Sequence, residues 1–227
     1  GSRSYLSSLF AFLIIRSDML LVNYFLGAAQ AGIYAVAVNL TDLLLVFPTA
    51  VGTMLFPRVS ARPEDEGSLT AAACRHTAAG MTVFCLVAGV LAQPLILLLY
   101  GRAFGGAAAP FLLLLPGILA LSLEIIFMND LAGRGLPPIV IVVPAVGLVL
   151  NLILNLAFIP RFGLLAAAAS SSLAYGAMLA IAWTAFARRT ATPAGACGFL
   201  TAADLKALYQ RLKPRPLAAE VTRDAQR

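Results

Sequence analysis

Charged residues are scarce in this sequence. Asp, Glu, Lys and Arg make up only 11% of its 227 residues, whereas a soluble domain contains about 25%. It has a single histidine, and its three cysteines, Cys74, Cys85 and Cys197, are scattered along the chain. That spacing fits neither a zinc site nor a disulfide framework. No loop gathers an acid, a base and metal-binding side chains, so we expect no bound metal, no cofactor and no enzymatic activity.

Apolar residues are abundant instead. They make up 61% of the chain, and the mean hydropathy is +0.92. They fall into six continuous runs, each close to the roughly 20 residues that a helix needs to cross a membrane. We therefore predict an all-α, polytopic membrane protein whose six-helix transmembrane bundle covers residues 1–189. The predicted helices are residues 5–26, 31–56, 77–100, 109–131, 139–159 and 164–186.

The polar segments are expected to lie outside the membrane. Residues 58–76, RVSARPEDEGSLTAAACRH, are the most polar internal stretch and are predicted to be a solvated loop. Residues 190–227 are predicted to be a partly disordered cytoplasmic tail, in which residues 199–213 can form an amphipathic helix on the membrane surface. Because the chain begins with Gly-Ser and has no signal peptide, we expect it to be a fragment of a longer protein.

Arginines are distributed unevenly between the alternate loops. With six helices, one side carries both termini together with Arg3, Arg58, Arg62, Arg75, Arg134, Arg188 and Arg189. The opposite side carries Arg102 and Arg161. Positively charged loops remain in the cytoplasm, so we predict cytoplasmic termini. This topology accounts for the net charge of +6 without any binding of nucleic acid.

Three ionisable residues interrupt the first two apolar runs: Arg16, Asp18 and Asp42. A charge at the bilayer centre costs about 2.5–3.5 kcal/mol, so each residue either lines a wet cavity or pairs inside the bundle, and the sequence leaves both interpretations open. Counted from the turn between the two helices, Arg16 and Asp42 both lie about 15–16 Å away. We predict that they pair near the membrane midplane. Asp18 is two residues from Arg16 and therefore points elsewhere in the bundle.

Small and polar residues in the later runs indicate close helix packing. Asn151 and Asn155 are one helical turn apart, and we predict that their amides form hydrogen bonds between helices. The three serines at 170–172, together with Gly176, are predicted to let two backbones approach closely. Pro94 predicts a kink near the end of the third helix.

Several motifs follow one another in an order known from one family. They are R-x-D at 16–18, FLG-x-x-x-x-GIYAVA at 25–37, LLLVFPTAVGTMLFPR at 43–58, NDLAGRGLPP at 129–138 and NLILNLAFIPRFGLLAAAASSSLAY at 151–175. In these motifs the chain resembles the second half of prokaryotic polysaccharide flippases. That group includes the lipid-linked oligosaccharide and O-antigen flippases of the multidrug/oligosaccharidyl-lipid/polysaccharide exporter superfamily.

The resemblance implies a fold, a function and partners. Such proteins are similar in having two six-helix bundles arranged as a V, so this chain would be the C-terminal half of a MATE-like exporter and its partner the missing N-terminal six-helix half. They flip undecaprenyl-linked glycans across the bacterial inner membrane, which makes the lipid-linked glycan and membrane lipids further expected partners. The resemblance also implies a substrate cavity with Arg16, Asp18, Asn39 and Asp42, to which Glu124 is added as an intramembrane acid.

Three other functions stay open. A multidrug or organic-cation antiporter of the same superfamily would share the architecture, although Arg16 would repel a cation and the helices lack an aromatic-rich patch. A membrane-embedded glycan-processing enzyme would need a cluster of catalytic residues, and residues 64–66 form only a solvated acidic run. A non-transporting subunit of an assembly complex is the third alternative.

Overall fold

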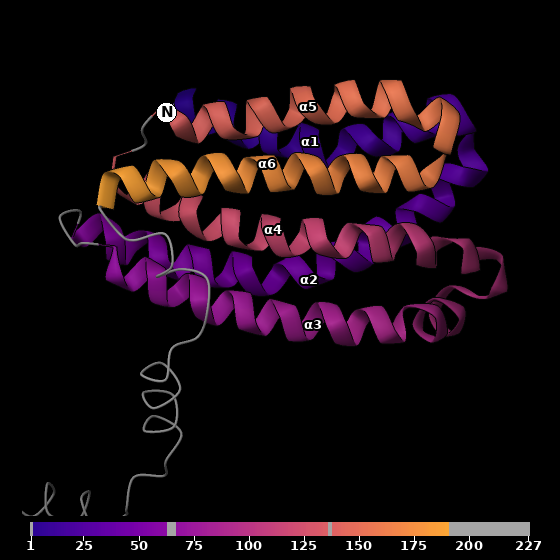
Figure 1. The fold of residues 1–227 in the computed structure, drawn as a ribbon, viewed down its shortest axis with the longest axis horizontal. Coiled ribbons are helices and arrows are strands. Elements are labelled where there is room, and N and C mark those ends of the chain that lie inside the picture. The colour runs from indigo at the N-terminus through magenta and orange to yellow at the C-terminus, as the bar shows by residue number, and fades with distance from the viewer. Residues whose placement is uncertain (1, 63–66, 136–137, 191–227) are drawn as a thin grey trace, which may run out of the picture.

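Long helices lie side by side along one axis in the computed structural model, which describes residues 2–62, 67–135 and 138–190 (Figure 1). No strand occurs in these residues, which confirms the all-α prediction. The α-helices are α1 (Ser2–Leu26), α2 (Ala28–Ala61), α3 (Ser68–Tyr100), α4 (Ala108–Gly133), α5 (Ile139–Phe162) and α6 (Leu164–Thr190), and a short 3₁₀ helix, η1 (Arg102–Ala107), precedes α4. Thr190, the first residue of the predicted tail, ends α6, and the rest of that tail, including residues 199–213, lies outside the described residues.

Five segments are long and apolar enough to cross a membrane. They are α2, α3, η1 with α4, α5 and α6. The chain is therefore a multi-pass membrane protein. α1 has 25 residues, or about 37 Å, which exceeds the roughly 30 Å of a hydrocarbon core. It is not among the five segments, so a sixth membrane span stays a prediction.

Successive helices run in opposite directions along the bundle. The α1–α2, α3–η1 and α5–α6 turns lie at one end, and the amino terminus and the end of α6 lie at the other (Figure 1). Each of these three turns contains a glycine with a positive φ: Gly27 at 84°, Gly101 at 84° and Gly163 at 63°. Glycine adopts this left-handed conformation without steric cost. The helix order therefore separates the arginine-rich loops from Arg102 and Arg161 as predicted, while the orientation in a membrane stays a prediction.

The prediction of a loop over all of residues 58–76 was wrong. α2 continues through Pro57 to Ala61, and α3 already begins at Ser68. The helix ends had been predicted where the run of apolar residues stops. However, α2 has 34 residues and is about 50 Å long, so it extends well beyond the thickness of a hydrocarbon core. The alanine-rich sequence that follows Ser68 keeps a high helix propensity outside that core.

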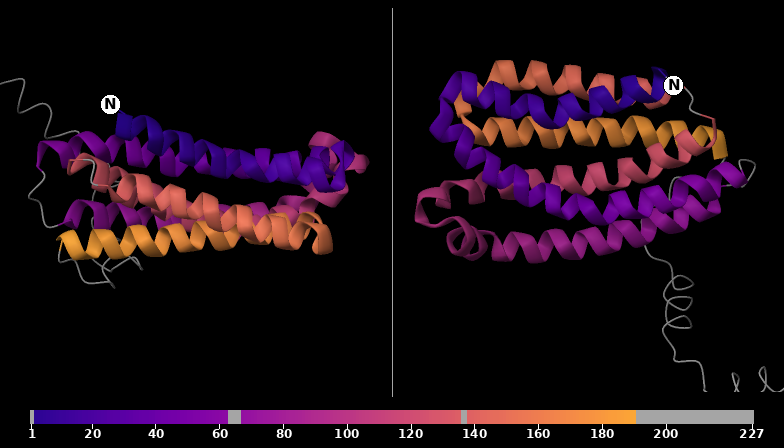
Figure 2. Two further views of the ribbon diagram at one scale, coloured as in Figure 1. Left: turned by 90° about the horizontal axis from the view of Figure 1, so that it is seen from above. Right: turned by 180° about the vertical axis from the view of Figure 1, so that it is seen from behind.

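α4 lies at the centre of the bundle. It packs against α2 and α3 on one side and against α6 on the other, and α1 and α5 pack together beyond α6 (Figures 1 and 2). α1 and α2 diverge from their shared turn, because α2 crosses toward α3 while α1 stays beside α5 (Figure 2).

The backbones of α4 and α6 touch where they cross. A β-carbon on Gly117 would lie 2.5 Å from the Cα of Ser172. The Ser172 hydroxyl donates a hydrogen bond to the carbonyl of Leu113 at 2.6 Å. The prediction of close packing by the serines is therefore confirmed. The same prediction was wrong for Gly176, because a β-carbon added to Gly176 would have no atom of another helix within 4 Å.

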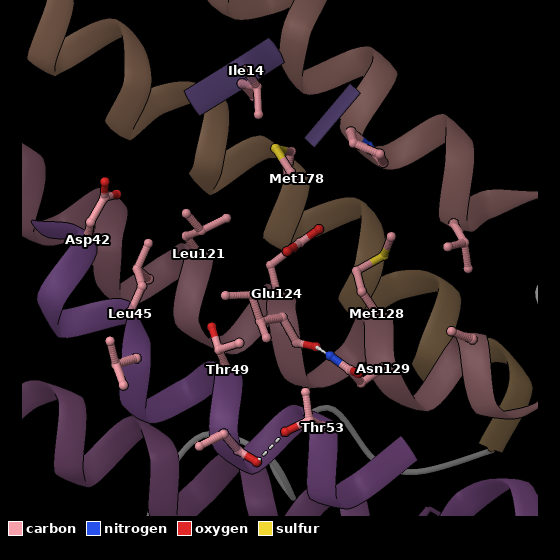
Figure 3. Close-up of a pocket in the computed structure, with 16 residues that line it drawn as sticks. Ile14, Asp42, Leu45, Thr49, Thr53, Leu121, Glu124, Met128, Asn129 and Met178 are labelled. Carbon is pink, nitrogen blue, oxygen red and sulfur yellow. Dashed lines mark hydrogen bonds between the residues drawn. The ribbon is translucent and has the colours of Figure 1, made fainter. Parts of the chain in front are cut away.

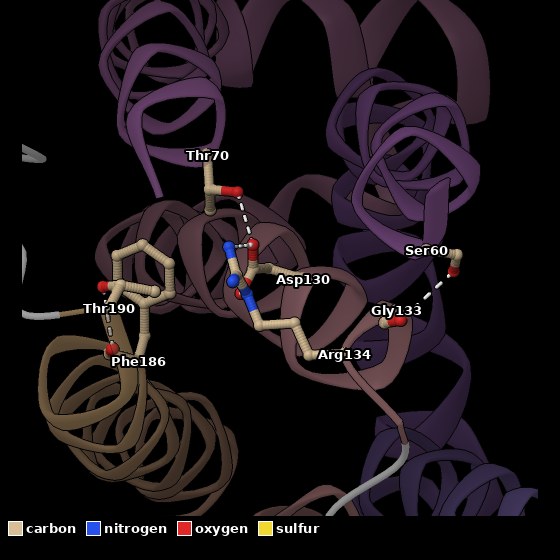
Figure 4. Close-up of polar contacts among 7 residues, drawn as sticks. All are labelled: Ser60, Thr70, Asp130, Gly133, Arg134, Phe186 and Thr190. Carbon is tan, nitrogen blue, oxygen red and sulfur yellow. Dashed lines mark hydrogen bonds and ion pairs between the residues drawn. The ribbon is translucent and has the colours of Figure 1, made fainter. Parts of the chain in front are cut away.

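A buried ion pair fastens the helices at the end of the bundle where α2 and α4 end (Figure 4). Arg134 Nε donates to Asp130 Oδ2 at 2.8 Å, and the Thr70 hydroxyl donates to Asp130 Oδ1 at 2.6 Å. The side chains of Asp130 and Arg134 are 0% and 8% exposed. Nearby, the Ser60 hydroxyl donates to the carbonyl of Gly133 at 3.2 Å. These contacts join α4 to both α3 and α2.

Candidate functional site

Asp18 is the centre of a buried hydrogen-bond network that joins four helices. Its carboxylate accepts hydrogen bonds from Tyr34 Oη at 3.2 Å, from Asn155 Nδ2 at 2.8 Å and from the hydroxyl of Ser171. These donors come from α2, α5 and α6, and Asp18 itself is only 3% exposed. The three hydrogen bonds replace those that water would make and satisfy the buried carboxylate.

Asn151 and Asn155 extend this network, as predicted. Asn155 Nδ2 donates to Asn151 Oδ1 at 3.0 Å, and Asn151 Nδ2 donates to Ser171 Oγ at 3.2 Å. The Ser17 hydroxyl donates to Asn151 Oδ1 at 3.1 Å, so α1, α5 and α6 are all connected. The prediction that these amides form hydrogen bonds between helices is confirmed.

Arg16 and Asp42 form an ion pair between α1 and α2. Arg16 Nη2 lies 3.8 Å from Asp42 Oδ2, which confirms the predicted pairing, and Asp18 points into the core instead. The two side chains are 44% and 38% exposed, so the pair lies at the surface of the bundle. An ion pair this exposed contributes only about 0–1 kcal/mol. The guanidinium therefore has donors available for another ligand.

A cavity of about 820 Å³ begins beside Asp42 and follows α2 away from the α1–α2 turn. Its walls come from α1, α2, α4, α5 and α6 and are mostly apolar (Figure 3). On α2 the polar lining residues are Asp42, Thr49 and Thr53, whose spacing places them on one face of the helix. The volume falls within the roughly 300–1,000 Å³ of typical ligand sites.

Glu124 lies on the opposite wall of this cavity. Its side chain comes from α4 and points into the space between Leu121, Met128 and Met178 (Figure 3). The residue is only 5% exposed, and no hydrogen bond or ion pair joins its carboxyl group to any residue that the structure describes. Among the residues that the structure describes, no three His, Cys, Asp or Glu side chains lie close enough together to hold a metal ion.

The structure brings some of the five predicted cavity residues together. Asp42 and Glu124 line the cavity, and Arg16 is joined to Asp42 at its edge. Asn39 is exposed on α2, one turn from Asp42 toward the α1–α2 turn. Asp18 lies behind the cavity wall and shares with Asp42 only a small void of about 10 Å³. A substrate-binding role for the five residues stays a prediction.

Sequence analysis missed several polar residues of this region. Thr49 and Thr53 lie seven and eleven residues after Asp42, and this helical spacing alone could have placed them on the same wall. Asn129 and Tyr34 gave no such signal. Each meets its neighbours only after separate helices have packed together, Tyr34 against Asp18 and Asn129 against Gly52 of α2.

The first helices of this site, α1 and α2, lie in a segment that is similar to known proteins. The profile of a family described as polysaccharide biosynthesis protein matches residues 1–109, which contain Arg16, Asp18, Asn39 and Asp42. Over these 109 residues the chain is similar to polysaccharide biosynthesis proteins. Together with the two relatives described next, this match confirms the resemblance to polysaccharide flippases that the motifs predicted.

Two proteins of Haloferax volcanii are similar to this chain. "Probable flippase AglR" is 28% identical over 216 residues, which cover 90% of this chain and 45% of AglR. "Probable low-salt glycan biosynthesis flippase Agl15" is 24% identical over 177 residues, which cover 76% of this chain and 38% of Agl15. The chain thus spans less than half the length of either protein. No solved structure matches it significantly.

Proposed function

We propose that this chain is part of a flippase that moves lipid-linked polysaccharide precursors from the inner to the outer leaflet for the synthesis of cell-surface polysaccharide. The observation that carries the proposal is the half-exposed pair of Arg16 and Asp42 at the edge of the 820 Å³ cavity, inside the segment that matches the polysaccharide biosynthesis family. The names of the relatives support a transporter and not an enzyme.

The chemistry of the site suits such a substrate. The diphosphate and sugars of a lipid-linked glycan cannot cross the acyl chains unprotected, because charge is costly there. The guanidinium of Arg16 offers forked donors for phosphate oxygens, and Asp42 holds this cation in place until phosphate replaces it. Asn39 and Glu124 offer hydrogen-bonding groups on either side of the pair. Asp18 holds α1 against α5 and α6 behind it.

We further propose that a second six-helix half completes the cavity. The matched relatives are more than twice as long as this chain, and transporter sites commonly lie between two structural repeats. The cavity lies where α1 and α2 diverge toward the end predicted to be cytoplasmic. The proposed location is the plasma membrane of a prokaryote. A bacterial inner membrane remains the narrower proposal, although both matched relatives are archaeal.

An organic-cation antiporter is the alternative that these observations disfavour. A half-exposed guanidinium at the cavity edge would repel a cationic substrate. Deletion of the gene in its own organism separates the two functions. We expect surface glycan to be lost and the lipid-linked glycan to accumulate on the cytoplasmic leaflet. Normal surface glycan combined with greater sensitivity to cationic drugs would contradict the proposal.

The same deletion strain tests the role of the ion pair. We expect a restored gene that carries Arg188→Ala to recover glycan export, because Arg188 is an exposed residue at the end of α6 and remote from the cavity. A gene that carries Arg16→Ala should not recover it. A plasmid encoding residues 1–227 alone should also fail, and export restored by this segment alone would contradict the need for a second half.

A further inference from the structure

The carboxyl group of Glu124 has no partner among the residues that the structure describes. The residue is only 5% exposed and lines the mostly apolar cavity, and no described donor or cation lies within hydrogen-bond or ion-pair distance of its carboxyl group. Burial of a polar group without a partner is unfavourable for folding. By contrast, the buried carboxylates of Asp18 and Asp130 are both held by several donors. The position of Glu124 is therefore better explained by a ligand than by the stability of the bundle.

The polar groups of the cavity are arranged along its length. The close contact of Gly52 with Asn129 fixes the level of α4 against α2. Asp42 lies ten residues before Gly52, which places the ion pair about 15 Å from the level of Asn129. Glu124 lies five residues before Asn129, about 7–8 Å back toward the ion pair. An elongated ligand can thus contact Arg16, Glu124 and Asn129 in succession.

We propose that Glu124 binds the hydroxyl groups of the first sugar of a lipid diphosphate glycan while Arg16 holds its diphosphate. This inference rests on the proposed function and assigns the sugar to a particular part of the cavity. Carboxyl oxygens accept hydrogen bonds from sugar hydroxyls. The carbonyl oxygen of Asn129 accepts as well, because its Nδ2 already donates to Ile125 at 2.8 Å. Met128 and Met178 line the wall beside them and offer apolar surface to the ring.

Binding of two soluble probes to the purified full-length protein, which contains this chain and its proposed second half, tests this assignment in detergent. The probes are farnesyl diphosphate and farnesyl-diphospho-N-acetylglucosamine, in which the sugar is esterified to the terminal phosphate and removes one of its ionisable oxygens. We expect the sugar to tighten binding by about tenfold, as one or two hydrogen bonds to an accepting oxygen can do. Glu124→Leu should abolish this gain and leave the affinity for farnesyl diphosphate unchanged. Glu124→Gln, which keeps an accepting oxygen, should retain most of the gain.

Two controls separate binding from folding. Val90→Ala changes an apolar side chain of α3 that is 79% exposed and does not line the cavity, so this variant should bind both probes as the unchanged protein does. Glu124→Leu should melt at the same temperature as the unchanged protein or higher, because an apolar residue replaces an unpaired polar group. A Glu124→Leu variant with lower thermal stability would show that the carboxyl group has a structural role and would overturn the inference.

The remaining outcomes distinguish this inference from the function on which it rests. Equal affinity of the unchanged protein for the two probes, or a sugar gain that survives Glu124→Leu, would overturn the inference alone. If Glu124→Gln loses the gain as completely as Glu124→Leu does, the site responds to charge and the assignment to sugar hydroxyls is wrong. If the full-length protein binds neither probe, the proposed function fails together with the inference.

Discussion

At the scale of single residues, the ionisable side chains in and beside the cavity have three different environments. Asp18 is buried and satisfied by three donors, Arg16 and Asp42 are paired at half exposure, and Glu124 is buried with no partner among the described residues. The first arrangement stabilises the fold, the second exposes a cation beside a cavity, and the third offers an acceptor inside that cavity. Substitution at each position should therefore give a different balance of stability and export.

Asp18→Leu should be strongly destabilising. The change leaves the hydroxyls of Tyr34 and Ser171 and the amide of Asn155 buried without their acceptor, at a cost of about 1–3 kcal/mol for each group. We expect a fall of about 3 kcal/mol or more in the free energy of unfolding, measured by thermal or denaturant unfolding in detergent. Asp42→Leu is the matched control and should cost about 1 kcal/mol or less, because its side chain is 38% exposed. Equal losses would contradict the assignment of Asp18 to the core.

A double-mutant cycle measures the coupling of Arg16 with Asp42. The change to Ala at either position leaves a lone charge beside the cavity, whereas the double change removes both charges. We expect the double variant to be expressed better than either single variant, and none of the three to export glycan. Strictly additive losses of expression would show that the two side chains do not interact.

At the scale of helices, packing was easier to predict than helix ends. The amides on α5 and the serines on α6 indicated their contacts because small and polar side chains on apolar helices mark interfaces. The ends of α2 and α3 were misplaced because helix propensity continues beyond the apolar core, even through Pro57. Gly176 and Gly117 are both glycines within apolar helices, and the sequence does not distinguish them. Only the fold shows that Gly117 faces another backbone and Gly176 does not.

Two glycine substitutions test the crossing of α4 and α6. Gly117→Ala would place a β-carbon 2.5 Å from the Cα of Ser172, so the two helices must move apart, and we expect a loss of about 1–3 kcal/mol in unfolding free energy. Gly176→Ala has open space, so it should leave stability unchanged or raise it by up to about 1 kcal/mol through helix propensity. Thermal unfolding of the two variants in detergent makes the comparison, and equal stabilities would contradict the close contact.

At the scale of the whole molecule, the sequence predicted the helical bundle, the pairing of Arg16 with Asp42 and the separation of arginines between its two ends. Apolar run length, depth along two antiparallel helices and loop charge are all readable without coordinates. The cavity could not be predicted from these sequence features. It depends on the divergence of α1 and α2 and on the contact of Gly52 with Asn129, which bring Glu124 opposite Thr49.

Cysteine labelling tests the orientation of the bundle. In a background without native cysteines, Ala103→Cys in η1 should react with an impermeant reagent added outside the cell, and Arg62→Cys after α2 should not. Both positions are exposed and lie at opposite ends of the bundle. The positive-inside rule predicts this result. The reverse labelling pattern would place both termini outside.

Photocrosslinking in living cells tests most directly whether this cavity binds a lipid-linked glycan. A benzophenone amino acid is placed at Thr49, which lines the cavity, or at Val83 on the outer surface of α3, which is 57% exposed and remote from it. After illumination, mass spectrometry of the purified protein should find a lipid diphosphate glycan attached at position 49 and none at position 83. Absence of this adduct at position 49, or equal labelling at both positions, would contradict a substrate site in the cavity.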